Sequence, residues 1–456
     1  MEFQTLKKNH RKRNILIGVM VVAIISACIL TFTRAKYRTT KSIKVAEGMI
    51  NYKVPDLNLV SLYIQSEEGT YVEADAIPTS GYKLNEAQSY CGISNNGEIT
   101  KDESVNIIYE NSAITFSNVT KKGTKCYLYF DEGSGSAADV ILAGKNIDSS
   151  RSGVITGILT TNTTGTVSIE DDDGISYLYA GAVDNNWVSF AGYYWRIIRI
   201  NGDNSIRMIY AGTSYGISGT DDQIQTSAYN DSTSQDNAYV GYMFGNIDAN
   251  NYESTHTNTN NSTIIEVLDQ WYEDNLLNYS DYISTEAGFC NDRKTQSEVW
   301  TGYGDLGYGT NTTAYAPAGR LFQNGWKSSQ TPTLKCSQIT NDLFTVSGSS
   351  KGNHALIYPI GIITSDEVVL AGGFGGQNNN SYYLFTNQDY WTMSPSSYNP
   401  PFGYPVVMNY VNSNGAPNFG TTLKPYGVRP VINLRADVSL TGTGTSSDPY
   451  TVTLTN

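Results

Sequence analysis

Few side chains in this 456-residue chain have the type and spacing that nucleophilic catalysis requires. Residues 212–216 read GTSYG and match the G-x-S-x-G pattern, in which Ser214 would be the nucleophile of a serine hydrolase. That pattern needs a strand, a sharp turn and then a helix, whereas a turn-rich stretch, ISGTDD, follows here. Beyond residue 44, only His256 and His354 could serve as a base. We therefore interpret Ser214 as a turn serine and expect the protein not to be an enzyme.

The most acidic run lacks the spacing of a calcium loop. Residues 170–174 read EDDDG, and the glycine comes too early for an EF-hand loop. We interpret this run as a solvated turn. We accordingly expect neither a metal site nor a cofactor.

Four cysteines lie outside the apolar N-terminal segment, and they fall into two well-separated pairs. No C-x-x-C spacing and no nearby histidine indicates zinc, and an even number of cysteines in an exported chain usually forms disulfides. We predict that Cys91 is bonded to Cys126 and that Cys290 is bonded to Cys336. The alternative is four buried thiols.

The most distinctive segment is 382–426, in which eleven of 45 residues are aromatic, about twice the 12% of the whole chain. Residues 390–434 contain no acidic residue. Tyrosine offers a large contact area with little side-chain entropy to lose, and Asn and Ser form adaptable hydrogen bonds, as in antibody binding surfaces. We predict that the loops 396–404 and 409–418 bind a ligand. The residues expected to contact it are Tyr398, Tyr404, Tyr410, Asn412, Asn414 and Asn418.

Other residues of this part of the chain are expected to be structural. Those expected in the core are Trp391, Val407, Val411, Val431 and Leu434. We expect Arg429 to anchor the aromatic-rich loops through hydrogen bonds to carbonyls rather than to touch ligand. The alternative to a binding face is a core strand flanked by ordinary Tyr-rich loops, because the chain has 34 tyrosines throughout.

Residues 14–33 form the only long uninterrupted apolar stretch, and it contains no charge. As a helix it would span about 30 Å, the thickness of a bilayer core. The basic residues before it tend to stay in the cytoplasm. We expect a single-pass signal-anchor in the cell membrane, with residues 1–13 in the cytoplasm and the remainder outside the cell. The alternatives are a cleaved signal peptide and a lipoprotein acylated at Cys28, although the apolar run continues past Cys28.

The chain beyond residue 44 is strongly acidic, with 20 basic and 42 acidic residues. Nucleic acids and anionic lipids bind proteins through Lys and Arg, so we expect no nucleic-acid partner. Only 16% of all residues are charged, while Gly reaches 42. This composition is typical of a β-rich surface protein with many turns.

Short alternating segments predict the domain order. Residues 45–130 are predicted to form a small antiparallel, Ig-like β-sandwich that acts as a spacer, with Cys126 facing its core. A glycine- and serine-rich stretch opens a flexible linker predicted over 131–152. A C-terminal domain is predicted over 153–456. The expected fold class is mainly β with few helices (α+β).

Local signals predict three elements within the C-terminal domain. Strands 193–200 and 205–210 flank Asn-Gly, which supplies the positive backbone angles of a tight hairpin. A helix is predicted over 263–277, with Thr263 as its cap and Glu266 completing a capping box. A short helix is predicted after Thr364, ending at the glycines 372–373, with only strands after it.

Three motifs resemble an uncharacterised family of bacterial surface proteins: WRIIRINGD from Trp195, YWTMSP from Tyr390, and YGVRPV from Tyr426. The C-terminal part of that family is similar to the C-type-lectin fold of the formylglycine-generating-enzyme type. The resemblance spans about 180–450. It implies this fold for 153–456, with Trp195, Trp391 and Arg429 in structural positions. The block ending KGTKCYLYF at residue 130 is similar to the N-terminal module of such proteins.

The activities of the resembled families do not carry over to this chain. The sulfatase-maturing enzymes use a reactive cysteine pair late in the domain, but no cysteine follows Trp391. Calcium-dependent C-type lectins use a Glu-Pro-Asn type of loop followed by Trp-Asn-Asp. Here residues 416–418 read APN, without the carboxylate, and no Trp-Asn-Asp follows.

These observations predict a membrane-anchored bacterial cell-surface protein that binds an extracellular protein or glycan ligand, or an adhesin, without catalysis. Two other functions remain open. One is a wall-associated enzyme that uses carboxylates, and the other is an assembly or matrix protein in which the sandwich joins copies.

Overall fold

The computed structural model describes most of the chain beyond residue 57. The described residues are 58–66, 70–74, 82–95, 98–110, 113–119, 124–132, 136–143, 145–148, 153–216, 219–231, 235–322, 329–400 and 405–454. The predicted membrane segment 14–33, with Cys28, lies outside them. Within the described ranges, no helix is both long and apolar enough to cross a membrane. The chain divides into two compact units, one of Met1–Ser61 with Glu86–Tyr127 and the other of Leu62–Asn85 with Leu128–Asn456.

The N-terminal strands form a six-stranded sheet in the order β2-β1-β8-β4-β5, with β3 also pairing with β8. Their bounds are β1 Asn58–Gln65, β2 Tyr71–Ala74, β3 Tyr82–Leu84, β4 Tyr90–Asn95, β5 Glu98–Lys101 and β8 Thr124–Glu132. A separate antiparallel ribbon consists of β6 (Asn106–Glu110) and β7 (Ala113–Ser117).

Side chains of β8 alternate between the interior and the surface, as the two-residue period of a strand requires. Cys126, Leu128 and Phe130 are fully buried, and the residues between them are partly exposed. Cys126 lies directly opposite Cys91 in the antiparallel register of β4 and β8, and the two form a disulfide. The prediction of this bond is confirmed.

The range 131–152, predicted as a flexible linker, contains regular structure. Helix α2 (Ala137–Leu142) begins with a complete capping box between Ser136 and Asp139. Its apolar residues Ala137, Ala138 and Ile141 belong to the main hydrophobic core. Strand β9 (Ile147–Asp148) then joins the first large sheet by parallel pairing with β10. The polar composition of 131–138 hid this helix, because a capping serine and small core alanines look like linker residues in the sequence.

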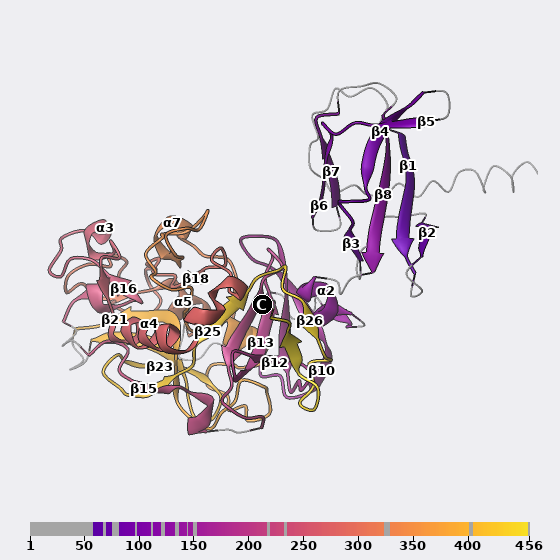
Figure 1. Cartoon of the computed structure of the whole chain (residues 1–456). Helices are drawn as coiled ribbons and strands as arrows, with labels where there is room; N and C mark the ends of the chain where they lie inside the picture. Colours follow the sequence, from indigo (N-terminus) through magenta and orange to yellow (C-terminus); the bar gives the residue numbers. More distant parts are fainter. Residues whose placement is uncertain are drawn as a thin grey trace, which may run out of the picture. The chain divides into compact units, whose positions relative to one another are not determined.

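The C-terminal body contains two large sheets. The first has nine strands in the order β26-β27-β12-β13-β11-β10-β9, and β14 joins β13 to β25. Its bounds beyond β9 are β10 Asn162–Glu170, β11 Ile175–Gly181, β12 Trp187–Phe190, β13 Tyr193–Ile200, β14 Ile206–Tyr210, β25 Val431–Leu434, β26 Leu440–Thr441 and β27 Tyr450–Val452. The yellow C-terminal strands thus lie beside the magenta strands β12 and β13, which come some 250 residues earlier (Figure 1).

The second sheet has six strands in the order β15-β24-β21-β22-β23, with β19 also pairing with β21. Its bounds are β15 Gln225–Ser227, β19 Thr313–Ala314, β21 Tyr390–Tyr398, β22 Val406–Val411, β23 Pro417–Thr421 and β24 Tyr426–Val428. Two short ribbons accompany it: β16 (Met243–Phe244) with β17 (Asn260–Asn261), and β18 (Phe289–Cys290) with β20 (Leu343–Phe344).

The hairpin of β13 and β14 is confirmed, but its glycine has a different role from the one expected. The positive backbone angle belongs to Asn204, with φ 65°. Gly202 instead allows a close approach, because a Cβ there would lie 2.4 Å from Oδ1 of Asp171 and 2.5 Å from the backbone nitrogen of Gly174. The turn therefore packs against the 170–174 run.

Few helices accompany these strands, and the expectation of a mainly β fold is confirmed. They are α2, α3 (Tyr252–Thr255), α4 (Thr263–Asn275), α5 (Ala316–Leu321), α7 (Ile339–Asp342) and α8 (Ser365–Ala371). For α4 the expected cap is wrong: Ser262 is the N-cap residue, and the Thr263 hydroxyl accepts a hydrogen bond from the Asp231 backbone.

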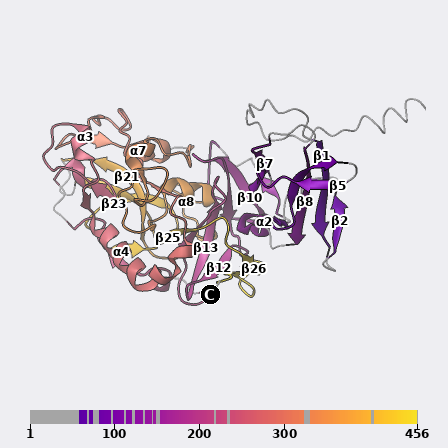
Figure 2. The same ribbon diagram turned by 45° about the horizontal axis from the view of Figure 1, so that its top comes forward.

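The short helix α8 connects the two large sheets. The helix predicted after Thr364 is present; Thr364 and Glu367 form a capping box at its start, and it ends at Gly372. All residues of α8 are buried, and it packs against β11 of the first sheet and β21, β22 and β23 of the second (Figure 2). One continuous core includes buried side chains of both sheets, among them Trp195 and Trp391.

Candidate functional site

Four of the six predicted contact residues lie on or beside the hairpin of β22 and β23. Tyr410 lies directly opposite Asn418 in the antiparallel register, so the two side chains share one face of the sheet. Tyr426, at the start of β24, stacks on Tyr410 with ring centroids 4.4 Å apart and an interplanar angle of 28°. Asn412 and Asn414 lie in the turn between the strands. We name Tyr410, Asn418 and Tyr426 the tyrosine platform.

A buried tryptophan supports this platform. Trp391 of β21 is fully buried, and its ring centroid lies 6.2 Å from that of Tyr410 and 4.7 Å from that of Tyr426. Its indole nitrogen donates to the carbonyl of Ser227 at 2.9 Å. Both tyrosines remain partly exposed. The platform is therefore a rigid surface, because the ring beneath it is fixed by packing and by a hydrogen bond.

Gly420 makes room for the stacked rings. A Cβ at this position would lie 3.2 Å from Cε1 of Tyr410 and 3.3 Å from the hydroxyl oxygen of Tyr426. These distances are shorter than normal van der Waals contact, so a larger residue here would push the rings apart. The glycine thus belongs to the site, although the sequence offered no sign of it.

Asn412 builds the turn instead of facing solvent as a free hydrogen-bonding group. Its Oδ1 accepts hydrogen bonds from the backbone nitrogens of Asn414 and Ala416, both at 3.0 Å. Gly415 takes a positive φ of 77°, and its carbonyl accepts from the Tyr382 hydroxyl at 2.9 Å. Asn414 is the exposed residue of this turn.

The other predicted loop differs from the expectation. Residues 396–398 are not a loop, because β21 continues to Tyr398, which pairs with Thr313 of β19. Tyr398 is fully buried, and its hydroxyl donates to the Gln235 carbonyl at 2.7 Å. Its side chain therefore cannot form part of a contact surface. Tyr404 lies outside the described residues.

The residues expected to be structural occupy interior positions. Trp195 is fully buried, and Arg429 is 2% exposed. The guanidinium of Arg429 donates to the carbonyls of Tyr210, Asp222 and Leu384 at 2.9–3.3 Å. These contacts agree with the anchoring role expected for Arg429.

Among the residues expected in the core, Val407 is only half-buried, whereas Val411, Val431 and Leu434 are fully buried.

The tyrosine platform is electrically neutral near pH 7. Burial is the main cause that raises the pKa of both Tyr410 and Tyr426. Their hydroxyls therefore keep their protons and can donate as well as accept hydrogen bonds. Asp389 lies close enough to add to this effect, and its carboxylate accepts from the Ser413 backbone at 2.6 Å.

A second group of aromatic rings lies on the other face of β23. Phe419 follows Asn418, so its side chain points to the opposite side of the strand. It is 40% exposed, and its ring lies 6.1 Å from Trp300 and 5.6 Å from Phe322. Trp300 and Phe322 belong to segments far from β23 in sequence, which is why the sequence did not indicate this group.

Two of the groups considered for catalysis, Ser214 and His256, lie in different environments. Ser214 lies in an exposed turn after β14. His256 is 1% exposed, with one ring nitrogen 3.0 Å from the Gly307 carbonyl and the other 3.3 Å from Arg293. Burial, with Arg293 as a second cause, lowers the pKa of His256 well below its usual range. This histidine is thus a neutral core residue.

The 170–174 run is an exposed turn except at Asp171. Asp171 is 8% exposed and forms an ion pair of 2.7 Å with Arg199. It also accepts hydrogen bonds from the Gly202 backbone and the Ser176 hydroxyl at 2.9 and 2.5 Å. Asp172 accepts from the backbone of Cys336 at 2.9 Å. The run therefore joins the first sheet to distant loops, which only the tertiary structure could show.

Comparison of the chain with protein-family models, curated proteins and solved structures finds no match.

Proposed function

We propose that this chain is a membrane-anchored cell-surface protein that binds an extracellular ligand through the tyrosine platform, without catalysis. The observation that carries the proposal is the partly exposed stack of Tyr410 and Tyr426 beside Asn418. Stacked aromatic rings with neutral hydroxyls and a neighbouring amide can offer both an apolar surface and hydrogen bonds to one ligand.

The rigidity of the platform supports a binding role. Trp391 and the close approach at Gly420 hold both rings in place before any ligand arrives. A preorganised surface loses less conformational entropy on binding than a mobile loop does. The exposed amide of Asn414 at the end of the same hairpin extends the surface.

The proposal also includes the architecture inferred from the sequence. The N-terminal segment 14–33 would anchor the chain, residues 45–130 would act as an Ig-like spacer, and 153–456 would be a C-type-lectin-like domain. Support for the last point comes from the three motifs in the sequence and from the mainly β body with few helices. The excess of acidic residues beyond residue 44 supports a ligand that is neither nucleic acid nor anionic lipid.

Binding of the full chain, reconstituted in nanodiscs, to a glycan array and to a panel of extracellular proteins tests the proposal. For any ligand found, Tyr410→Ala should weaken binding about thirtyfold or more, because truncating an aromatic anchor typically costs about 2 kcal/mol or more. Asn418→Ala should weaken it less. The melting temperature should change little, since both side chains are partly exposed.

Tyr215→Ala is the matched control, because Tyr215 is a 46% exposed tyrosine outside the platform. It should leave the affinity unchanged. Normal binding by the Tyr410→Ala variant, together with loss of binding after a change in the N-terminal sheet, would move the recognition site to that sheet and refute the proposal.

A further inference from the structure

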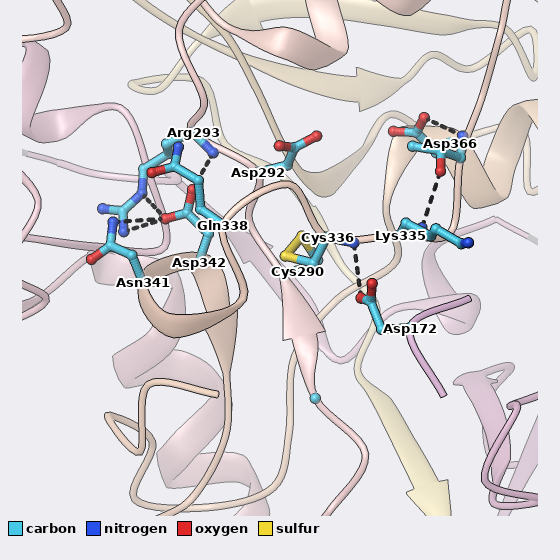
Figure 3. The surroundings of a disulfide bond; sticks show 12 residues. Asp172, Cys290, Asp292, Arg293, Lys335, Cys336, Gln338, Asn341, Asp342 and Asp366 are labelled. Atoms are coloured by element: carbon cyan, nitrogen blue, oxygen red, sulfur yellow. Dashed lines mark hydrogen bonds and ion pairs between the residues drawn. A yellow bond between two sulfur atoms is a disulfide. The ribbon is translucent and has the colours of Figure 1, made fainter. Parts of the chain in front are cut away.

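A cavity of about 60 Å³ lies beside the disulfide of Cys290 and Cys336. Cys290 belongs to β18, and Cys336 lies in the loop that leads to α7. Figure 3 shows Asp172, Asp292 and Asp366 around this bond, carried by three different parts of the chain. The cavity brings together groups that the tyrosine platform does not involve.

The wall of the cavity is unusually rich in charged side chains. Its acidic members are Asp171, Asp172, Asp173, Asp292, Asp366 and Glu367, and its basic members are Arg199, Arg207, Arg320 and Lys335. In one half of this wall, positive and negative charges are equal in number. Arg199 contacts Asp171 at 2.7 Å and Glu367 at 3.1 Å, and Arg207 contacts Glu367 at 2.6 Å.

The other half carries an excess of negative charge. Arg320 donates two hydrogen bonds of 2.9 Å to Asp366, and its remaining terminal nitrogen lies 2.7 Å from Oδ2 of Asp292. One cation is thus shared by two carboxylates, both at most 4% exposed. Asp172 forms no ion pair within the described part of the chain, although its carboxylate accepts the Cys336 backbone hydrogen bond.

The wall also contains a buried acceptor without a donor among the described residues. Asp292 is 4% exposed, and it shares the guanidinium of Arg320 with Asp366, so its charge is only partly compensated. Asn201 is 5% exposed; its amide nitrogen donates to Ser205 and Asn433, but its Oδ1 has no donor within the described part of the chain. A buried acceptor left without a donor destabilises a fold, so a group that supplies positive charge or hydrogen atoms fits this space.

We infer that the cavity binds a small monovalent cation, either an ammonium group or an alkali-metal ion. The excess negative charge beside Asp292 attracts it, and the oxygens of Asp292 and Asn201 can contact it. The cavity volume of about 60 Å³ holds a few water-sized groups, which fits a small ligand. Divalent metals prefer several carboxylate oxygens at once, and the described residues include no group of three acidic, Cys or His side chains placed to hold one.

Thermal unfolding of the full chain in detergent tests this inference. The melting temperature is compared in ammonium, potassium and tetramethylammonium chloride at equal ionic strength, because tetramethylammonium is too large for the cavity. Ammonium or potassium should raise it by about 2 °C or more relative to tetramethylammonium. An effect of ammonium alone identifies a ligand that donates hydrogen bonds, and an equal effect of both ions identifies one selected by charge and size.

Asp292→Asn tests the same site. This variant keeps the shape of the side chain but removes its charge, so the difference between the salts should disappear. Asp437→Asn, at a side chain that is 67% exposed, is the matched control and should keep the difference.

If Asp292→Asn does not fold, calorimetric titration of the natural chain with ammonium chloride replaces it, and saturable heat is expected. Equal melting temperatures in all three salts, a salt difference that survives Asp292→Asn, or no saturable heat would each overturn the inference and leave the cavity to water.

Discussion

The ion pair of Arg293 and Asp342 is the most completely buried pair of the C-terminal body, because both side chains are 0% exposed. Asp342 accepts from the backbone nitrogen of Arg293 at 2.6 Å, from Nε at 2.8 Å and from Nη2 at 2.7 Å. The arginine also donates to the Met243 carbonyl and to Asn258. Through these contacts one guanidinium joins the segments around residues 243, 258, 293 and 342.

We predict that Asp342→Asn destabilises this body strongly. Removing one partner of a buried pair leaves an uncompensated charge and typically costs about 3–5 kcal/mol. The asparagine keeps one acceptor, so we expect the lower end of that range, about 3 kcal/mol. At roughly 2 °C or more per kcal/mol for a body of this size, the melting temperature should fall by about 6 °C or more.

Intrinsic tryptophan fluorescence is the appropriate assay, because all six tryptophans lie at or beyond residue 187, in the C-terminal body. Asp437→Asn serves as the control, since the Arg435–Asp437 pair is exposed, with 49% and 67% of its side chains accessible. An exposed pair contributes about 0–1 kcal/mol, so this control should melt within about 2 °C of the natural chain. A fall of less than about 2 °C for Asp342→Asn would refute the reasoning that the buried charge needs its partner.

Two further predictions concern single side chains. Burial, with Glu266 as a second cause, raises the pKa of Asp269 to about 7, against 3.8 for the unperturbed group. Because the folded state favours its protonated form, the stability gained at low pH should be lost as pH rises from about 4 to 7. Asp269→Asn should flatten this part of the pH profile of the melting temperature, and parallel profiles for the variant and the natural chain would contradict the assignment. Arg429→Ala should lower the free energy of unfolding by about 2 kcal/mol or more, measured by guanidinium titration, because three buried carbonyls each lose a hydrogen bond from the guanidinium. Lost ligand binding with an unchanged unfolding midpoint would instead place Arg429 in the binding site.

Features with a local signal in the sequence were predicted correctly. The hairpin of β13 and β14 follows from two apolar strands around a turn, and α8 follows from Thr364 before it and the glycines 372–373 after it. Both disulfides follow from the even number and the spacing of the cysteines. In each case, residues close together in the sequence or restricted by simple chemistry carry the information.

Features that depend on which distant segments meet were missed or misassigned. Tyr398 was predicted as a contact residue, because nothing near it in sequence shows that β19 and Gln235 cover it. Within the 170–174 run, the burial of Asp171 was missed, because the arginine that pairs with it lies on β13. Tyr426 was not among the predicted contact residues, although it forms half of the aromatic stack.

The sequence by itself determined the mainly β class, the two disulfides and the region in which uncharged aromatic residues concentrate. Only the tertiary structure decided which of those residues remain at the surface, which acidic groups are buried, and where an unpaired acceptor lines a cavity. The physical reason is that burial and charge pairing depend on the packing of the whole body. Its first sheet is completed by β25 and β27, which come more than 200 residues after the strands they join.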